Sequence, residues 1–179
     1  GDNPGAQDTA DILEKVLTAA TVNNDIAFQG GLKNNQLNQV QVEEFCGFIY
    51  VNLDRSAPAL ASQSGDLATE IRHWAPDTGE LTFSHRLTYD IKSNWKNVVD
   101  NFLECYHCPT AHKDFCSLVD MDTYRVTTHG IYSSHMADAG KGANSAYDVS
   151  NATVRTHAVW WLWPTTCLMR YPGRSSMIV

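Results

Sequence analysis

Two histidines, His107 and His112, stand five positions apart in the segment ECYHCPTAH, and imidazole nitrogens bind transition metals. On a regular helix, residues five apart point about 140° away from each other, so an unbroken helix would hold the two rings apart. Pro109 lies between them, and proline interrupts a helix because it lacks an N–H and clashes with the preceding turn. We therefore predict a helix break near Pro109 that lets both imidazoles meet at one metal ion.

Glu104 precedes His107 by three positions, which would place both on one face of a helix. Its carboxylate could ligate the metal, orient a ligand histidine or act as an acid or base. Two imidazoles and one carboxylate form the facial triad of non-haem iron oxygenases, which leaves positions open for O₂ and substrate. Zinc is the alternative, either in a hydrolase or in a module built from Cys105, His107, Cys108 and His112.

The periodicity of apolar residues predicts the elements that position these side chains. Alternating or β-branched segments predict strands at 40–45, 47–54, 80–93, 124–136, 152–163, 166–171 and 176–179. Helical spacing predicts helices over 10–22 and 66–75, and a third from Asn94 to near Pro109. Polar stretches at 23–37 and 138–151 are predicted to be loops. Strands on both sides of one central helix indicate an α+β fold with a mostly antiparallel sheet.

The composition of the 179 residues is that of a globular protein, with 43% hydrophobic and 18% charged residues. The net charge of −7, without any Lys/Arg cluster, argues against a nucleic-acid partner, because phosphates need a basic surface. No apolar run reaches the roughly 18 residues of a membrane span, so we expect no membrane association. The spacings of the five cysteines do not resemble a secreted disulfide framework. We therefore expect reduced thiols and a cytoplasmic location, with Cys105, Cys108 and Cys116 as small buried residues.

The segment NWKNVVDNFLECYHCPTAHKDF, residues 94–115, resembles the iron-site segment of Rieske non-haem iron oxygenase α-subunits. In that family, Asn-Trp-Lys opens a helix that leads into an acid-x-x-His-x4-His run. Weaker similarity extends from residues 40–54 to the C-terminal 160–179. The resemblance implies a helix-grip fold, an antiparallel sheet with helices, truncated in this chain. It assigns residues 38–179 to a partial catalytic domain and leaves residues 1–37 unassigned.

Carried over by position, the resemblance implies that His107 and His112 bind Fe(II). Glu104 matches the acid that bridges the electron path to the Rieske cluster of a neighbouring subunit, and Asp100 and Asn101 match residues that line the site. The third iron ligand in that family is a carboxylate far downstream, which we do not expect within these residues. A [2Fe–2S] cluster needs a C-x-H and a C-x2-H about sixteen residues apart; Cys105-Tyr106-His107 has the first form, but no C-x2-H follows, so we interpret that match as accidental. The resemblance further implies a homotrimer and a reductase that supplies electrons from NAD(P)H.

Three phrases, ECYHCPTAHKDF, VDMDTY and THGIYSSHMA, resemble the branch of this family that acts on quaternary ammonium compounds such as glycine betaine and carnitine. The implied reaction is O₂-dependent hydroxylation next to the cationic nitrogen and loss of a carbonyl fragment. Aromatic faces bind such cations, and we predict that Tyr132, Trp161 and Trp163 do so. The alternatives are an aromatic-ring dioxygenase, a zinc hydrolase and a non-catalytic binding module. The sequence gives no functional role to five further histidines: His73, His85, His129, His135 and His157.

Overall fold

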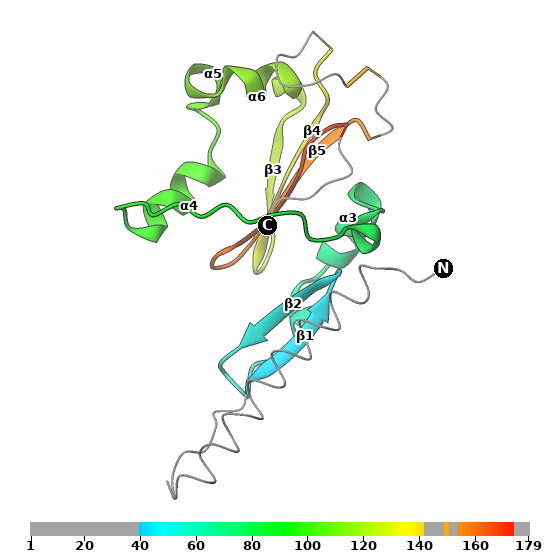
Figure 1. Ribbon diagram of the computed structural model, residues 1–179, viewed down its shortest axis with the longest axis vertical. Coiled ribbons are helices and arrows are strands. Elements are labelled where there is room, and N and C mark those ends of the chain that lie inside the picture. Colours follow the sequence, from blue (N-terminus) through cyan, green and yellow to red (C-terminus); the bar gives the residue numbers. More distant parts are fainter. Residues whose placement is uncertain (1–39, 142–148, 151–153, 174–179) are drawn as a thin grey trace, which may run out of the picture.

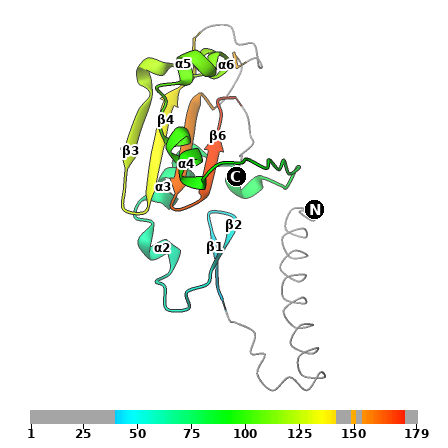
Figure 2. The ribbon, with the colours of Figure 1, turned by 90° about the vertical axis from the view of Figure 1, so that its left-hand side faces the viewer.

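The centre of the computed structural model, which describes residues 40–141, 149–150 and 154–173, is an antiparallel sheet in the order β3-β4-β5-β6. Its strands are β3 (Arg125–Thr128), β4 (Tyr132–Asp138), β5 (Thr156–Leu162) and β6 (Thr166–Arg170). β5 lies between β4 and β6 (Figure 2). It is buried over nearly its whole length. Its β-branched and aromatic residues suit this central position.

The strand register divides this sheet into two faces, because successive side chains point to opposite sides. Trp160 pairs with Ser134 and Leu168 and shares their face, which we call the core face. Val159 pairs with His135 and Met169 on the opposite face, which we call the cavity face. Helices cover both faces: α3 lies on one side of the sheet, and α4, α5 and α6 lie on the other (Figure 1).

Helix α3 (Leu67–Trp74) confirms the helix predicted over 66–75. It covers the core face of the sheet. Leu67 and Ile71, four positions apart on one helical face, are fully buried in the cluster that contains Trp160. Glu70 adds polar contacts, since its carboxylate accepts hydrogen bonds from the Tyr132 hydroxyl at 2.9 Å and the Trp160 Nε1 at 3.1 Å. The shorter helices α2 (Leu60–Gln63) and η1 (Thr78–Glu80) flank α3 in the chain.

A separate hairpin joins β1 (Gln41–Phe45) to β2 (Phe48–Asn52) and confirms the strands predicted at 40–45 and 47–54. Its two turn residues, Cys46 and Gly47, have φ of 54° and 84°. Positive φ at both positions gives the twist that suits a two-residue hairpin. Phe45 inserts into the core cluster of α3 and so attaches the hairpin to the main sheet.

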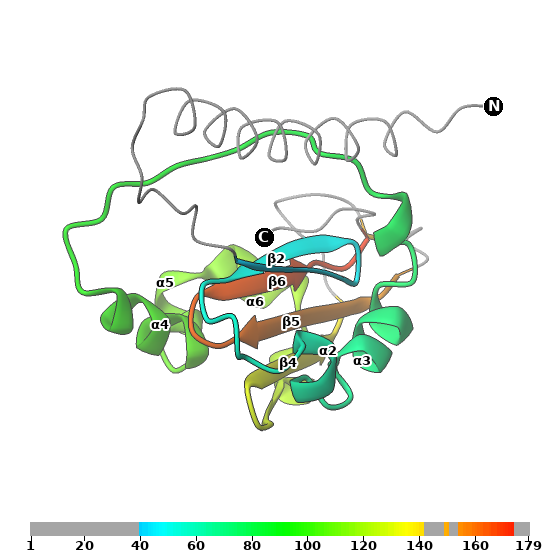
Figure 3. The same ribbon diagram turned by 90° about the horizontal axis from the view of Figure 1, so that it is seen from below.

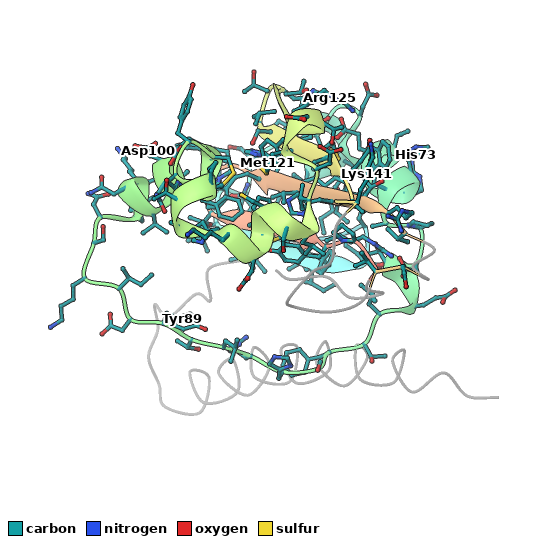
Figure 4. All side chains as sticks on the ribbon, turned by 90° about the horizontal axis from the view of Figure 1, so that it is seen from above. His73, Tyr89, Asp100, Met121, Arg125 and Lys141 are labelled. Atoms are coloured by element: carbon teal, nitrogen blue, oxygen red, sulfur yellow. A yellow bond between two sulfur atoms is a disulfide. The ribbon has the colours of Figure 1, made fainter. Side chains whose placement is uncertain are left out.

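The prediction of a strand over 80–93 is wrong for the described structure, where residues 81–94 form an extended segment without strand pairing. The apolar side chains that alternate along it are exposed, among them Phe83, Leu87, Tyr89 and Ile91. Figures 3 and 4 show this segment looping away from the sheets, with Tyr89 far from the core. Alternation describes the segment's own two faces, but a strand also needs a partner with free backbone groups, and no described segment pairs with it.

The predicted helix from Asn94 becomes three helical pieces, α4 (Trp95–Leu103), α5 (Cys108–Ala111) and α6 (Lys113–Leu118). Asn94 caps α4, since its side chain accepts a hydrogen bond from the Lys96 N–H at 3.0 Å. The predicted break is confirmed, but its position near Pro109 is wrong. The chain leaves the helix at Glu104, and Pro109 lies in the first turn of α5, where its missing N–H costs nothing.

The strands predicted at 124–136, 152–163 and 166–171 are confirmed with shifted bounds, and the first of these segments contains two paired strands with a turn at 129–131. η2 (Met121–Thr123) precedes the first of them. The helix predicted over 10–22, the loop at 23–37 and the strand at 176–179 lie outside the described residues, as does most of the loop at 138–151. Among the described helices, none has the length and apolar character that crossing a membrane requires.

Candidate metal centre

His107 and His112 lie at the two ends of α5, with ring centroids 4.9 Å apart and ring planes at 75°. His112 has φ −125° and ψ 58°, so the chain bends there before α6 begins. This bend, rather than Pro109 alone, brings the second imidazole toward the first. Both rings line a cavity of about 580 Å³ between this helical segment and the cavity face of the sheet. The two rings therefore lie close enough to share one metal ion, and their role as ligands stays a prediction.

Glu104 contacts His107 directly, through a short hydrogen bond between its Oε1 and the Nδ1 of the imidazole. The second carboxylate oxygen accepts a hydrogen bond from the Tyr106 N–H at 2.5 Å. The bond with His107 is the main cause that lowers the pKa of Glu104, which favours the charged carboxylate. Because Nδ1 is engaged, Nε2 of His107 is the nitrogen left for a metal, an arrangement common among metal-binding histidines.

The donor set fits a transition metal only in part. Two neutral imidazoles are good ligands for iron or zinc. Within the described ranges, however, no group of three His, Cys, Asp or Glu side chains could hold a metal ion. Glu104 is occupied with His107 and orients that ring rather than completing a triad. A facial triad would therefore draw its carboxylate from residues other than those described.

The other predicted site residues occupy different places. Asn101 lines the cavity, whereas Asp100 is exposed on α4 and is not among the lining residues (Figure 4). Tyr132 points to the core face and bonds Glu70. Trp161 lies on the cavity face, but its ring packs against Phe102 of α4 at 5.3 Å. Neither Tyr132 nor Trp161 lines the cavity, and their substrate-binding roles stay predictions.

Trp163 follows the last residue of β5, is exposed, and packs against Trp95 with ring centroids 5.8 Å apart. Aromatic residues that do line the cavity come from α4, α6, the turn before β3 and the end of β6: Phe102, Phe115, Tyr124 and Tyr171. None of these four is among the aromatic residues that the sequence predicts to bind a cation. They lie far apart in the chain, and only the fold gathers them.

Two histidines without a predicted role, His135 and His157, also line the cavity. Their positions on β4 and β5 place both on the cavity face of the sheet. The Tyr124 hydroxyl lies 3.0 Å from Nδ1 of His135. In the sequence, both histidines alternate with apolar residues of the core face, which hints that they lie on the opposite face. That hint identifies cavity residues only when the pairing register of β4 and β5 is known.

Burial keeps this wall of the cavity uncharged. His157 is 2% exposed, and desolvation lowers its pKa to about 4, although a hydrogen bond to the backbone of Arg170 acts in the opposite direction. Desolvation also lowers the pKa of His135 and raises that of Tyr124 to about 12. At neutral pH the sheet side of the cavity therefore presents neutral rings.

Residues 78–178 match the sequence model described as "Ring hydroxylating alpha subunit (catalytic domain)". The chain belongs to this family. It is 35% identical over 144 residues to the carnitine monooxygenase oxygenase subunit of Escherichia coli K12, which covers 80% of this chain and 38% of that protein. It is 38% identical over 93 residues to the chloroplastic choline monooxygenase of Beta vulgaris, covering 49% of this chain and 21% of that protein. The chain thus spans 38% of the length of this carnitine monooxygenase subunit, well under half of the relative.

Solved structures of this family agree with the fold. A quaternary ammonium Rieske monooxygenase described in relation to carnitine oxidation and inter-subunit electron transfer superposes with a TM-score of 0.67 at 28% identity, covering 75% of this chain and 36% of that one. The same kind of enzyme, CntA, solved with γ-butyrobetaine gives 0.59 at 29% identity, covering 75% and 33%. The predicted family and the α+β fold are confirmed.

The expectation of reduced thiols is wrong for one pair in this family member, because Cys105 and Cys108 form a disulfide. The turn between α4 and α5 brings their Cα atoms to 5.0 Å, which permits the bond. Cys108 is buried, as predicted, whereas Cys105 is only half-buried. Cys116 carries a free thiol and is also half-buried. In this state the sulfur atoms of the pair are bonded to each other and are not available to a zinc ion.

Proposed function

We propose that this chain is part of the catalytic domain of a Rieske-type oxygenase that hydroxylates a quaternary ammonium compound at a mononuclear Fe(II) site. The observation that carries the proposal is the pair His107 and His112 on one cavity wall, with Glu104 hydrogen-bonded to Nδ1 of His107. Membership of the ring-hydroxylating family favours iron over the zinc alternatives. The names of its relatives favour a quaternary ammonium substrate over an aromatic ring.

His107 and His112 would hold the iron through their imidazole nitrogens, together with a carboxylate from outside the described residues. When bound, the ion supplies the O₂ activation on which hydroxylation depends. Glu104 fixes the tautomer and the orientation of His107, because its charged carboxylate accepts the Nδ1 proton. Asn101 lies on the same wall and offers an amide that could orient O₂ or substrate.

The aromatic part of the cavity wall supports a cationic substrate. Phe115, Tyr124 and Tyr171 pack around His157 with ring centroids between 5.1 and 6.4 Å from that imidazole. A quaternary ammonium group has no N–H to donate, so it is held by aromatic faces rather than by hydrogen bonds. The reaction would place a hydroxyl on a carbon next to the cationic nitrogen and release a carbonyl fragment. CntA has been solved with γ-butyrobetaine and with L-carnitine, which are of this class.

Electrons would come from outside this chain. Glu104 keeps 35% of its side chain exposed, so its carboxylate can also face a neighbouring subunit. It would bridge His107 to a [2Fe–2S] cluster held by residues absent from this chain, within a homotrimer served by a reductase that uses NAD(P)H. A relative of this family has been described in terms of inter-subunit electron transfer, which supports this role.

The metal part of the proposal is tested by anaerobic titration with Fe(II), with nitric oxide as a spectroscopic probe of bound ferrous ion. We expect the wild-type chain to give the paramagnetic Fe–NO signal, and His107→Asn and His112→Asn to weaken iron binding about 100-fold or more. His129→Asn is the matched control, because that imidazole stacks on Tyr132 away from the cavity. Equal iron binding in all four proteins would refute the site.

A further inference from the structure

The extended segment between η1 and α4 exposes a row of large apolar side chains. They stand at alternate positions of an extended chain, so they share one face of it. Four of them have exposed fractions between 60% and 76%: Phe83, Leu87, Tyr89 and Ile91. Contiguous apolar surface on a folded protein marks a place where a partner binds. The row therefore indicates an interaction surface.

The backbone of the same segment is also free to pair. In the part of the chain that the structure describes, residues 82–90 make no backbone–backbone hydrogen bond. The segment loops away from the sheets, and no described strand lies along it (Figure 3). Unpaired N–H and C=O groups on an extended segment attract another strand, and the aromatic and β-branched residues here favour strand pairing. A further strand is therefore the partner that fits.

The charged side chains of the segment lie on the opposite face from the apolar row. Arg86 and Asp90 are exposed, and neither forms an ion pair within the described ranges. When the segment pairs antiparallel with a second copy about Thr88, Arg86 of each copy faces Asp90 of the other. In the same register, Leu87 of each copy faces Tyr89 of the other. Opposite charges directly across two strands stabilise the pairing, and the apolar side chains bury surface against each other.

Among the two-fold axes from Arg86 to Asp90, the one at Thr88 alone pairs opposite charges. An axis at Arg86 or at Asp90 places two like charges directly opposite each other, which destabilises a strand pair. An axis one residue after Thr88 sets Arg86 opposite Lys92, and an axis one residue before it sets both charges opposite uncharged side chains. Axes nearer to the ends of the segment shorten the overlap, because η1 and α4 bound it.

We propose that residues 85–91 pair as an antiparallel strand with the same residues of a second copy of this chain, with Thr88 on the two-fold axis. A two-fold contact closes on itself and gives a dimer. The contact uses no residue that lines the cavity, so it goes beyond the proposed function and does not depend on it. It is also distinct from the homotrimer proposed above, which needs a different interface.

Sedimentation of the full chain over a range of concentrations measures the dimer. We expect the dimer fraction to rise between about 1 µM and about 1 mM, because a single strand pair is a small interface. Arg86→Asp should raise the dissociation constant about 10-fold or more, since it sets acidic side chains opposite each other twice, and Asp90→Arg should do the same with basic ones. The double variant exchanges the two charges and should return to within about 3-fold of wild type. Arg72→Asp, at an exposed position of α3, makes the same charge change away from the segment and is the control.

A cysteine on the axis tests the register directly. In Thr88→Cys the two introduced thiols would face each other, so a mild oxidant such as diamide should link two chains through residue 88, which mass spectrometry identifies. Thr82→Cys is the matched control, because the same residue type is exposed there but lies off the axis. We expect it to link at least about 10-fold less.

Three results would overturn the proposal. The first is a chain that stays monomeric up to about 1 mM. The second is a dimer whose dissociation constant is unchanged by the single charge reversals or not restored by the exchange. The third is equal cross-linking of Thr88→Cys and Thr82→Cys. None of these readouts involves iron or substrate, so a failure here is distinguishable from a failure of the proposed function.

Discussion

The Glu104 carboxylate and the Nδ1 of His107 form a hydrogen bond just beyond the end of α4, where the chain has already left the helix. The contact therefore depends on the turn and not on helical spacing. It fixes which nitrogen of His107 faces the cavity, and it keeps a negative charge one ring away from the metal position. The remaining carboxylate oxygen is held by the Tyr106 N–H, so the acid itself has little freedom.

Replacing this acid should weaken the metal site without dismantling it. We expect Glu104→Ala to lower Fe(II) affinity about 10- to 100-fold, because His107 loses its fixed tautomer and orientation. Glu104→Gln should fall between the alanine variant and wild type, since its amide oxygen can still accept the Nδ1 proton but carries no charge. Fe(II) competition titrations under anaerobic conditions measure the series. The control is Glu80→Gln, which changes an exposed carboxylate on η1. Wild-type Fe(II) affinity in Glu104→Ala would contradict the role given to Glu104.

The buried imidazole of His157 predicts a pH dependence of stability. In the unfolded chain a histidine takes up its proton near pH 6.5, whereas burial delays protonation of folded His157 to about pH 4. Between these values the unfolded state binds more protons, so stability falls as the pH is lowered through this window. The shift corresponds to roughly 3 kcal/mol at its full extent. His135, whose pKa is lowered for the same reason, should add to this loss.

Urea unfolding at a series of pH values measures this dependence. His157→Phe keeps an aromatic ring of similar size, and we expect it to flatten the slope of unfolding free energy between pH 6.5 and 4 relative to wild type. Above pH 7 the two proteins should differ by a constant amount, because His157 is neutral in both folded and unfolded states there. Parallel curves across the acidic window would show that this imidazole is not the group responsible.

The local part of the site could be predicted from sequence, and the assembled part could not. His107, His112 and Glu104 lie within nine residues, so a family motif was enough to bring them together. Phe115, Tyr124 and His157 meet only because the sheet register and the position of α6 place them on one wall, which no local pattern encodes. The same limit explains residues 80–93, where a correct alternation had no described partner strand. Such pairing depends on distant parts of a chain.

The aromatic wall predicts selectivity for a cation. We expect Tyr124→Leu to weaken binding of L-carnitine or γ-butyrobetaine about 3- to 30-fold, because an aliphatic side chain has no negative π face. Tyr124→Phe keeps that face and loses only the hydrogen bond to His135, so its affinity should stay close to wild type. An analogue with a neutral tert-butyl group in place of trimethylammonium supplies the comparison in isothermal titration. Equal losses for the charged and the neutral ligand would mean that Tyr124 contributes shape and not cation–π attraction.

On the opposite side of the sheet, Glu70 should be important for stability and not for the cavity. Its carboxylate accepts hydrogen bonds from Tyr132 and Trp160, both of which are buried, and no other described side chain takes these donors. Glu70→Ala leaves both donors without a partner and should lower the free energy of unfolding by about 3 kcal/mol. Glu70→Gln keeps one acceptor oxygen and should lose less. Chemical denaturation measures the change, with exposed Glu44→Ala as control. If the free energy of unfolding of Glu70→Ala matched that of the control, the two hydrogen bonds would have no net stabilising effect. Any loss of Fe(II) binding in Glu70→Gln would contradict the separation of the core face from the cavity face.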